Sequence, residues 1–193
     1  MRHSMPCSLS LPKGIREKKT KMMSLDHPKT LRGVAYRTFR HESPLGEMHS
    51  VWTATGLYSL LWIGEGELIA DVLPADEDDN AGSLDQALTQ YFETGRPDFS
   101  GITIDHRDRT DFSKSIYHCC QQIEAGTTLT YKELAGRAGN EAASRAVGAA
   151  MARNRCVLVI PCHRVISTQG ELRGFSAPGG VDSKRFLLDL ETQ

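Results

Sequence analysis

One short segment in the last third of the chain constrains fold and chemistry more than any other. An apolar run at residues 157–160 leads directly into Pro161, Cys162, His163 and Arg164. The run predicts a buried strand. Proline fixes one backbone dihedral and has no amide hydrogen, so we expect the chain to leave the strand at Pro161 and to present the thiol at a turn. A free thiol has a pKa of about 8.5, so Cys162 needs a neighbour that stabilises its thiolate, and His163 and Arg164 are the candidates.

Residues 160–165, with the sequence IPCHRV, resemble the acceptor motif of the O6-alkylguanine-DNA alkyltransferases, also called methylated-DNA–protein-cysteine methyltransferases. Further matches flank this motif in the family's order. They are Thr130, Tyr131, Leu134, Ala135, residues 144–149 and Asn154 upstream, and Gly170, Gly174, Phe175, Ser176, Gly179, Gly180, Lys184, Leu187, Leu188 and Glu191 downstream. The resemblance is close over residues 110–193 and loose before them. So many ordered matches over about eighty residues make a chance match implausible.

The sequence predicts an α+β protein with a tail and two domains. Residues 1–30 are polar and basic, and we expect them to form a disordered tail. Residues 31–106 form the first, α+β domain, and residues 110–193 form a mostly helical second domain. The resemblance implies that the first domain is a small ribonuclease-H-like scaffold without chemistry of its own.

Hydrophobic periodicity places the expected elements of the first domain. Strand-like patterns lie at residues 34–39, 48–53 and 58–63, and a helical pattern lies at residues 84–92. A last apolar piece at residues 102–104 precedes a charged linker at residues 106–110.

The second domain should contain two short helices joined by a tight turn. The sequence TYKE at residues 130–133 has the form of a capping box, in which Thr130 and Glu133 satisfy each other's backbone amides. A helix should therefore begin there and end near Gly139, and a second helix should cover residues 142–152. This arrangement favours a helix-turn-helix, and the resemblance implies a winged one.

The second of these helices is unusual for a reader of base sequence. Within residues 142–152 Arg145 is the one long polar side chain, and the others are mostly alanine and glycine. Readout of base edges in the major groove needs several Arg, Asn or Gln side chains, so sequence preference should be weak. Small residues suit a close approach to the minor groove with one side chain as a wedge. The alternative is a helix packed on the core through its alanines, and both can hold on opposite faces.

Charge is distributed unevenly along the chain. Residues 1–40 carry a net charge of +8, residues 41–111 of −12, and residues 112–193 of +3. The acidic middle segment would be repelled by phosphates, so DNA contact should lie in the last third. The expected partner is double-stranded DNA containing O6-alkylguanine, with O4-alkylthymine as a further lesion, and we expect a monomer.

Composition argues against metal, cofactor, membrane and disulfide classes. The five cysteines are an odd number without framework spacing, which favours reduced thiols in the cytoplasm, or in the nucleus of a eukaryote. Metal-ligand spacing is absent, so we expect no metal site, and we expect no cofactor. Apolar stretches such as residues 60–63 are far too short to span a membrane, and the basic start lacks the apolar core of a secretory signal.

The resemblance implies a relay for the reaction. Cys162 is the alkyl acceptor, His163 acts as its base through a water, and Glu191 orients the histidine, as in triad logic. Asn154 resembles the family's hinge residue between the recognition helix and the active-site loop. Two alternatives stay open from the residues alone: Asn154 as a helix C-cap, and Glu191 as a solvated residue of a frayed terminal helix.

The resemblance also implies the groups that bind DNA and the extruded base. Arg145 matches the arginine that fills the gap left by the flipped base, and its helix contacts DNA through Ser144, Ala146 and Gly148. The base pocket is expected to comprise Tyr131, Val165, Phe175 and Ser176. Tyr131 would also accommodate the rotated phosphate.

The chain departs from the family pattern at three places. Arg155 replaces a common proline, Phe175 replaces a usual tyrosine, and Ala177 and Pro178 lengthen the loop over the pocket. We expect these changes to affect rate and tolerated alkyl size rather than the class of reaction.

Three other functions are weighed against alkyl transfer. A non-catalytic lesion-binding protein of the same fold would lack the acceptor cysteine. A transcriptional regulator would need base-reading side chains on the second helix, and a cysteine hydrolase would need an evident oxyanion hole. The sequence supplies the cysteine and lacks the other two features.

Overall fold

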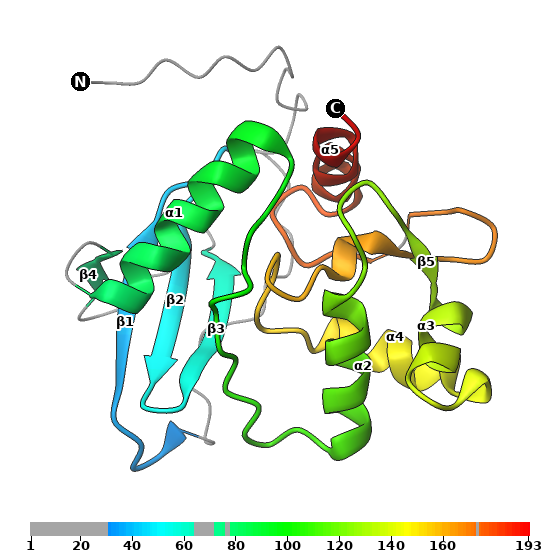
Figure 1. The fold of residues 1–193 in the computed structure, drawn as a ribbon, viewed down its shortest axis with the longest axis horizontal. Coiled ribbons are helices and arrows are strands. Elements are labelled where there is room, and N and C mark those ends of the chain that lie inside the picture. The colour runs from blue at the N-terminus through cyan, green and yellow to red at the C-terminus, as the bar shows by residue number, and fades with distance from the viewer. Residues whose placement is uncertain (1–30, 64–71, 76–77, 173) are drawn as a thin grey trace.

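The computed structural model describes residues 31–63, 72–75, 78–172 and 174–193. A sheet covered by one long helix forms one half of the molecule, and shorter helices with long connections form the other half (Figure 1). The predicted tail at residues 1–30 lies outside the described residues. No helix in the described ranges is long and apolar enough to cross a membrane.

The sheet of the first half has the strand order β3-β2-β1-β4 within the described residues. Its strands are β1 (Tyr36–His41), β2 (Met48–Thr53), β3 (Gly56–Trp62) and β4 (Val72–Pro74). Pairing is antiparallel between β1 and β2 and between β2 and β3, and parallel between β1 and β4. The structure confirms the three expected strands, with their ends shifted by up to two residues.

Helix α1 (Asp79–Thr94) crosses one face of this sheet (Figure 1). It starts earlier than the apolar pattern predicted, because the Asp78 carboxylate caps it by accepting from the amides of Asn80 and Ala81. It ends at Gly95, which adopts a left-handed conformation with φ of 68°. Its buried face carries Ala81, Leu84, Ala87, Leu88, Tyr91 and Phe92.

A line of polar contacts, buried in the sheet and partly exposed at its α1 end, fixes α1 to the sheet. His41 Nε2 lies 2.7 Å from Ser50 Oγ, and His41 Nδ1 lies 3.0 Å from Asp85 Oδ1 on α1. Trp52 Nε1 donates to the same Ser50 oxygen at 3.0 Å. The trio of serine, histidine and aspartate resembles a hydrolase triad, but Ser50 is fully buried and already accepts from Trp52. These contacts are therefore structural.

The second half contains α2 (Asp111–Gln121), α3 (Tyr131–Arg137), α4 (Ser144–Ala152) and α5 (Val181–Glu191). A 3-10 turn (Glu141–Ala143) joins α3 to α4, and strand β5 (Leu129–Thr130) pairs in parallel with β6 (Val165–Ile166). Both halves of the predicted capping box are present at Thr130 and Glu133. The expected second helix begins at Ser144, since residues 141–143 form the 3-10 turn instead.

The expected strand at residues 157–160 is wrong. These residues are buried, but the chain turns sharply there, with Leu158 at φ of 68° and the Ile160 amide donating to the Cys156 carbonyl at 2.8 Å. Asn154 closes the turn, because its side chain donates to the Ile160 carbonyl and accepts from the Cys156 amide. An apolar run indicates that residues are buried but not that they form a strand. A buried turn whose backbone groups bond to one side chain produces the same run.

One apolar cluster joins the two halves. It includes Phe39 on β1, Leu88 on α1, Ile160 in the buried turn and Leu187 on α5. The charged stretch at residues 106–110 therefore connects two halves that share one core, and not two domains with separate cores.

The tight β2–β3 connection generates a stability prediction. Gly56 has φ of 140°, and a Cβ there would lie 2.4 Å from the Thr103 carbonyl oxygen. Gly56→Ala should lower the free energy of unfolding in urea by about 2 kcal/mol or more. Gly101→Ala is the matched control, because a Cβ at Gly101 meets nothing within 4 Å, and it should stay within about 0.5 kcal/mol. Equal effects of the two variants would contradict this account.

Candidate active site

Cys162 starts a short 3-10 turn, Cys162–Arg164, directly after Pro161. The expected turn at Pro161 is thus present, although it follows a buried turn and not a strand. Cys162 lines a pocket of about 360 Å³ between α4 and the loop before α5. The other lining residues are Tyr131, Gly148, Met151, Ala152, Gly174, Phe175 and Ser176.

The pocket brings together most of the residues expected to surround a base. Tyr131 comes from the start of α3, and Phe175 and Ser176 come from the loop before α5. Val165 is fully buried and does not line this pocket; its carbonyl accepts from Lys184 Nζ at 2.6 Å. Phe175 lies edge-on to the His163 ring, with centroids 6.3 Å apart, so it forms an aromatic wall next to the relay.

His163 and Glu191 form a buried pair behind the thiol. His163 Nε2 lies 2.7 Å from Glu191 Oε1, and both side chains are almost fully excluded from solvent. Glu191 therefore lies in the interior at the end of α5 and is not a frayed, solvated residue. An ionised carboxylate only accepts, so the proton of a neutral His163 lies on Nε2 and its Nδ1 carries a lone pair. Nδ1 is buried and has no partner among the described residues.

Arg164 binds Glu191. We expected it beside the thiol, but its Nε donates to Glu191 Oε2 at 3.0 Å and its Nη2 to Oε1 at 2.9 Å. The Gly126 amide donates to Oε2 at 3.2 Å as well. Burial alone would raise the pKa of Glu191, but the hydrogen bonds and charges of His163 and Arg164 outweigh it and lower that pKa to about 2.

Burial also keeps the other two members of the relay uncharged at rest. Desolvation lowers the pKa of His163 and outweighs the opposing effect of Glu191, so the imidazole is neutral near pH 7. Desolvation raises the pKa of Cys162. A hydrogen bond from Asn154 and the charge of Lys184 lower that pKa but do not outweigh the desolvation. The thiol therefore keeps its proton near pH 7, and His163, next to it in the chain, is neutral with a lone pair on Nδ1.

Asn154 holds the loop that carries the cysteine. Its Nδ2 donates to the Ile160 carbonyl at 2.8 Å, and its Oδ1 accepts from the Cys156 amide at 3.0 Å. The C-cap of α4 is Arg153, so Asn154 is the first residue beyond the helix and not its cap. This position connects α4 directly to the turn that leads to Cys162.

Helix α4 presents different faces to the core and to solvent. Val147, Ala150 and Met151 are buried, whereas Arg145 and Ala146 are exposed and Ser144 and Gly148 are half-buried. The structure therefore confirms that one face of this helix packs on the core, and the contact of its exposed face with DNA stays a prediction. Its free face starts beside the pocket, which Gly148 lines.

Sequence reasoning missed Tyr91, which comes from α1 in the first half. Its hydroxyl donates to Glu191 Oε1 at 2.8 Å and lies 3.4 Å from His163 Nε2, and its side chain is fully buried. Burial and then the charge of Glu191 raise the pKa of Tyr91 well above its ordinary value, so it remains a donor. Tyr91 occupies an apolar position of α1, and the sequence carries no signal that its hydroxyl meets a residue 100 positions away.

Known proteins are similar to this chain over much of its length. The family model "6-O-methylguanine DNA methyltransferase, DNA binding domain" matches residues 111–193. A methylated-DNA–protein-cysteine methyltransferase of Methanosarcina barkeri is 37% identical over 153 residues, which cover 78% of this chain and 93% of that protein.

Solved structures show the same fold. A crystal structure of an O6-methylguanine methyltransferase from Mycobacterium tuberculosis matches with a TM-score of 0.70 and 29% identity, over 82% of this chain and 93% of that one. A structure of OGT from the same organism in complex with DNA matches with a TM-score of 0.65 and 32% identity, over 81% and 92% of the two chains. With a similar sequence over most of its length and the same fold, the chain belongs to the methylated-DNA–protein-cysteine methyltransferase family.

Proposed function

We propose that this protein repairs DNA directly, by transferring the alkyl group of O6-alkylguanine to its own Cys162. The observation that carries the proposal is the buried thiol at a base-sized pocket, backed by a neutral histidine and an ionised carboxylate. Family membership supports the same reaction, since the relatives are named for methyl transfer from DNA to a protein cysteine. The non-catalytic alternative is not favoured, because the acceptor cysteine is present and lines the pocket.

The proposed step moves one alkyl group and one proton. His163 Nδ1 removes the Cys162 proton through a water, and the thiolate sulfur attacks the alkyl carbon. The carbon–O6 bond breaks as the carbon–sulfur bond forms, and its electron pair stays on the guanine, which takes up the proton. Glu191 stabilises the transient imidazolium of His163. The thioether has no leaving group that a protein side chain can displace, so each molecule reacts once.

We expect DNA to bind at α3 and α4. We assign residues 110–193 as a winged helix-turn-helix domain and residues 31–106 as a ribonuclease-H-like scaffold, with a disordered tail at residues 1–30. The free face of α4, with Ser144, Arg145 and Ala146, would lie against the minor groove, and Arg145 would fill the gap left by the flipped base. Its small side chains support weak sequence preference.

The remaining assignments follow from the same proposal. Tyr131, Phe175 and Ser176 would hold the extruded guanine, with O4-alkylthymine as a further substrate. The protein would act as a monomer on double-stranded DNA, without metal or cofactor, in the cytoplasm or nucleus.

The first prediction tests stoichiometry. Incubation with duplex DNA containing O6-methylguanine should add one methyl group per protein molecule, measured by intact mass, and repair should then stop. Cys162→Ala should abolish the mass change, because Cys162 is the one cysteine of the described residues that lines the pocket. The control Cys119→Ala removes a partly exposed cysteine and should react normally. Sustained turnover, or methylation of the Cys162→Ala variant, would refute the assignment.

The second prediction separates base extrusion from chemistry. Arg145→Ala should slow repair of alkylated duplex DNA by about tenfold or more and leave the reaction with free O6-benzylguanine nearly unchanged, because the free base needs no extrusion. Rates of single-turnover benzyl transfer measure both. Arg185→Ala, an equal charge change at an exposed position of α5, should alter neither rate strongly. Equal slowing of both substrates by Arg145→Ala would place Arg145 in the pocket or the fold.

The third prediction concerns Tyr91 and pH. Tyr91→Phe removes a donor from Glu191 Oε1, which leaves more negative charge facing His163 and should raise the pKa of that imidazole. Only neutral His163 can act as the base, so its activity is lost as pH falls through this pKa. The acidic limb of the pH–rate profile should therefore move up by roughly half a pH unit or more.

Tyr117→Phe provides the control for this experiment. Tyr117 is also buried, and its hydroxyl donates to the Ala150 carbonyl at 2.9 Å, away from Glu191. Its loss should cost similar stability without moving the acidic limb for benzyl transfer from O6-benzylguanine. An unmoved limb in Tyr91→Phe would show that Tyr91 serves packing alone.

A further inference from the structure

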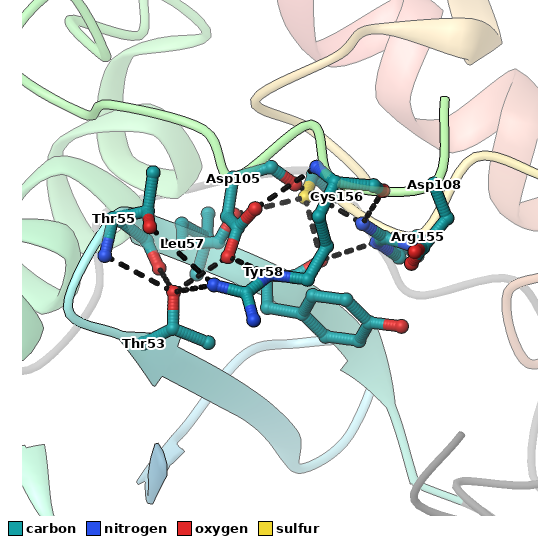
Figure 2. Close-up of polar contacts among 10 residues, drawn as sticks. Thr53, Thr55, Leu57, Tyr58, Asp105, Asp108, Arg155 and Cys156 are labelled. Atoms are coloured by element: carbon teal, nitrogen blue, oxygen red, sulfur yellow. Dashed lines mark hydrogen bonds and ion pairs between the residues drawn. The ribbon is translucent and has the colours of Figure 1, made fainter. Parts of the chain in front are cut away.

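Arg155 occupies the position directly after the hinge residue Asn154, where the family pattern commonly has proline. Its side chain is only 12% exposed, although arginine is usually a surface residue. The guanidinium points back toward the first half of the molecule, where it meets β3 and the connection at residues 105–108 (Figure 2). A charged side chain buried in this way must be held by several acceptors.

Those acceptors are backbone carbonyls from two separate segments. Arg155 Nε donates to the Tyr58 carbonyl on β3 at 2.7 Å. Its Nη2 donates to the carbonyls of Asp105 and Arg107, each at 3.1 Å. The planar fork of arginine can serve such divergent acceptors at once, which a lysine ammonium on its flexible stem does less well.

The Arg155 guanidinium also contacts the Tyr58 ring through its face and Asp108 through Nη1. The guanidinium carbon lies 3.7 Å from the centroid of the Tyr58 ring, a close cation–π contact, and Nη1 lies 3.8 Å from Asp108 Oδ2 (Figure 2). Arg155 therefore connects β3, the connection between the two halves and the active-site loop at one point.

The connection that receives Arg155 is itself fixed to the sheet. The Asp105 carboxylate accepts from Thr53 Oγ1 and from Arg107 Nε, each at 2.6 Å, and the Asp105 amide donates to the Leu57 carbonyl at 2.8 Å. The anchor for Arg155 is thus rigid.

From Arg155 the contacts lead into the site in two steps. The Arg155 carbonyl accepts from the Leu60 amide at 2.7 Å, and the Val157 amide donates to the Leu60 carbonyl at 3.1 Å, so the loop is paired with β3. The neighbouring Asn154 then closes the turn through Ile160 and stabilises the Cys162 thiolate by a hydrogen bond. A proline at position 155 would stiffen the backbone but could make none of the side-chain contacts.

We propose that Arg155 is a positioning residue for alkyl transfer, which ties the loop carrying Asn154 and Cys162 to β3 and to residues 105–107 and so makes the reactivity of Cys162 depend on the first half of the molecule. This inference rests on the proposed function. Arg155 touches neither the substrate pocket nor the relay, and it acts through Asn154.

The test compares Arg155→Met with Arg153→Met in the full chain. Methionine keeps much of the length and removes every donor. Arg153 is exposed and two positions away, so its variant loses the same charge but keeps the contacts of Arg155 with β3 and residues 105–108. We would measure single-turnover transfer from free O6-benzylguanine, which excludes effects on DNA affinity, and the pH dependence of Cys162 alkylation by iodoacetamide. Both are measured at a temperature where each variant is folded.

Arg155→Met should slow benzyl transfer by about tenfold, because small displacements of a reacting group cost much rate. It should also move the midpoint of iodoacetamide alkylation to higher pH, since the thiolate loses the well-placed Asn154. Arg153→Met should match the wild type in both. A lower melting temperature of Arg155→Met with wild-type rate and midpoint would overturn the proposal and leave Arg155 a purely structural role.

Arg155→Lys decides the question if the methionine variant does not fold. A lysine ammonium keeps the charge but replaces the fork by a single point, so transfer should fall at least severalfold with a smaller shift of the midpoint. An unchanged rate and midpoint in Arg155→Lys would overturn the proposal. If the wild-type protein itself fails to acquire a benzyl group on Cys162, the proposed function fails, and that result is read separately from the comparison of variants.

Discussion

The buried carboxylate of Glu191 is the interaction on which the site depends. A carboxylate without partners in the interior costs several kcal/mol, so the fold has to bring donors to it from every side. They come from α1, from the turn after α2 and from the residues behind the cysteine: Tyr91, Gly126, His163 and Arg164. The terminal helix, the reactive turn and the first half of the molecule therefore become a single unit, because moving any of them would leave a buried charge unpaired.

This network explains how one site can hold a reactive cysteine in a resting form. Burial favours the neutral states of both Cys162 and His163, while Glu191 stays ionised because several donors share its charge. The imidazole is thus fixed in the tautomer that presents a lone pair at Nδ1. Reactivity is then a matter of placement, since the thiol and the base must be held at the correct separation. The turn closed by Asn154 leads directly to Cys162, and the Arg155 side chain fixes the start of this turn to β3 and to residues 105–107.

Local signals in the sequence predicted the local structure well. The strand-like patterns of the first half, the capping box at Thr130 and the small residues of α4 all produce their elements by short-range physics. The same reasoning wrongly predicted a strand at residues 157–160. These apolar residues form a buried turn, whose backbone groups bond to the Asn154 side chain. Hydrophobicity alone cannot distinguish a buried strand, whose backbone groups pair with another strand, from a buried turn, whose backbone groups bond to a side chain.

The sequence by itself determined the chemistry: a thiol preceded by proline and followed by histidine, a distant glutamate, and a helix too poor in long polar side chains to read bases. Tertiary structure alone decided how these groups share charge. Arg164 binds Glu191, Tyr91 reaches Glu191 from the other half of the molecule, and Arg155, at a position where the family commonly has proline, is largely buried and donates to β3. Hydrogen-bond partners far apart in the chain are chosen by the packing of the shared core, and no local pattern records that choice.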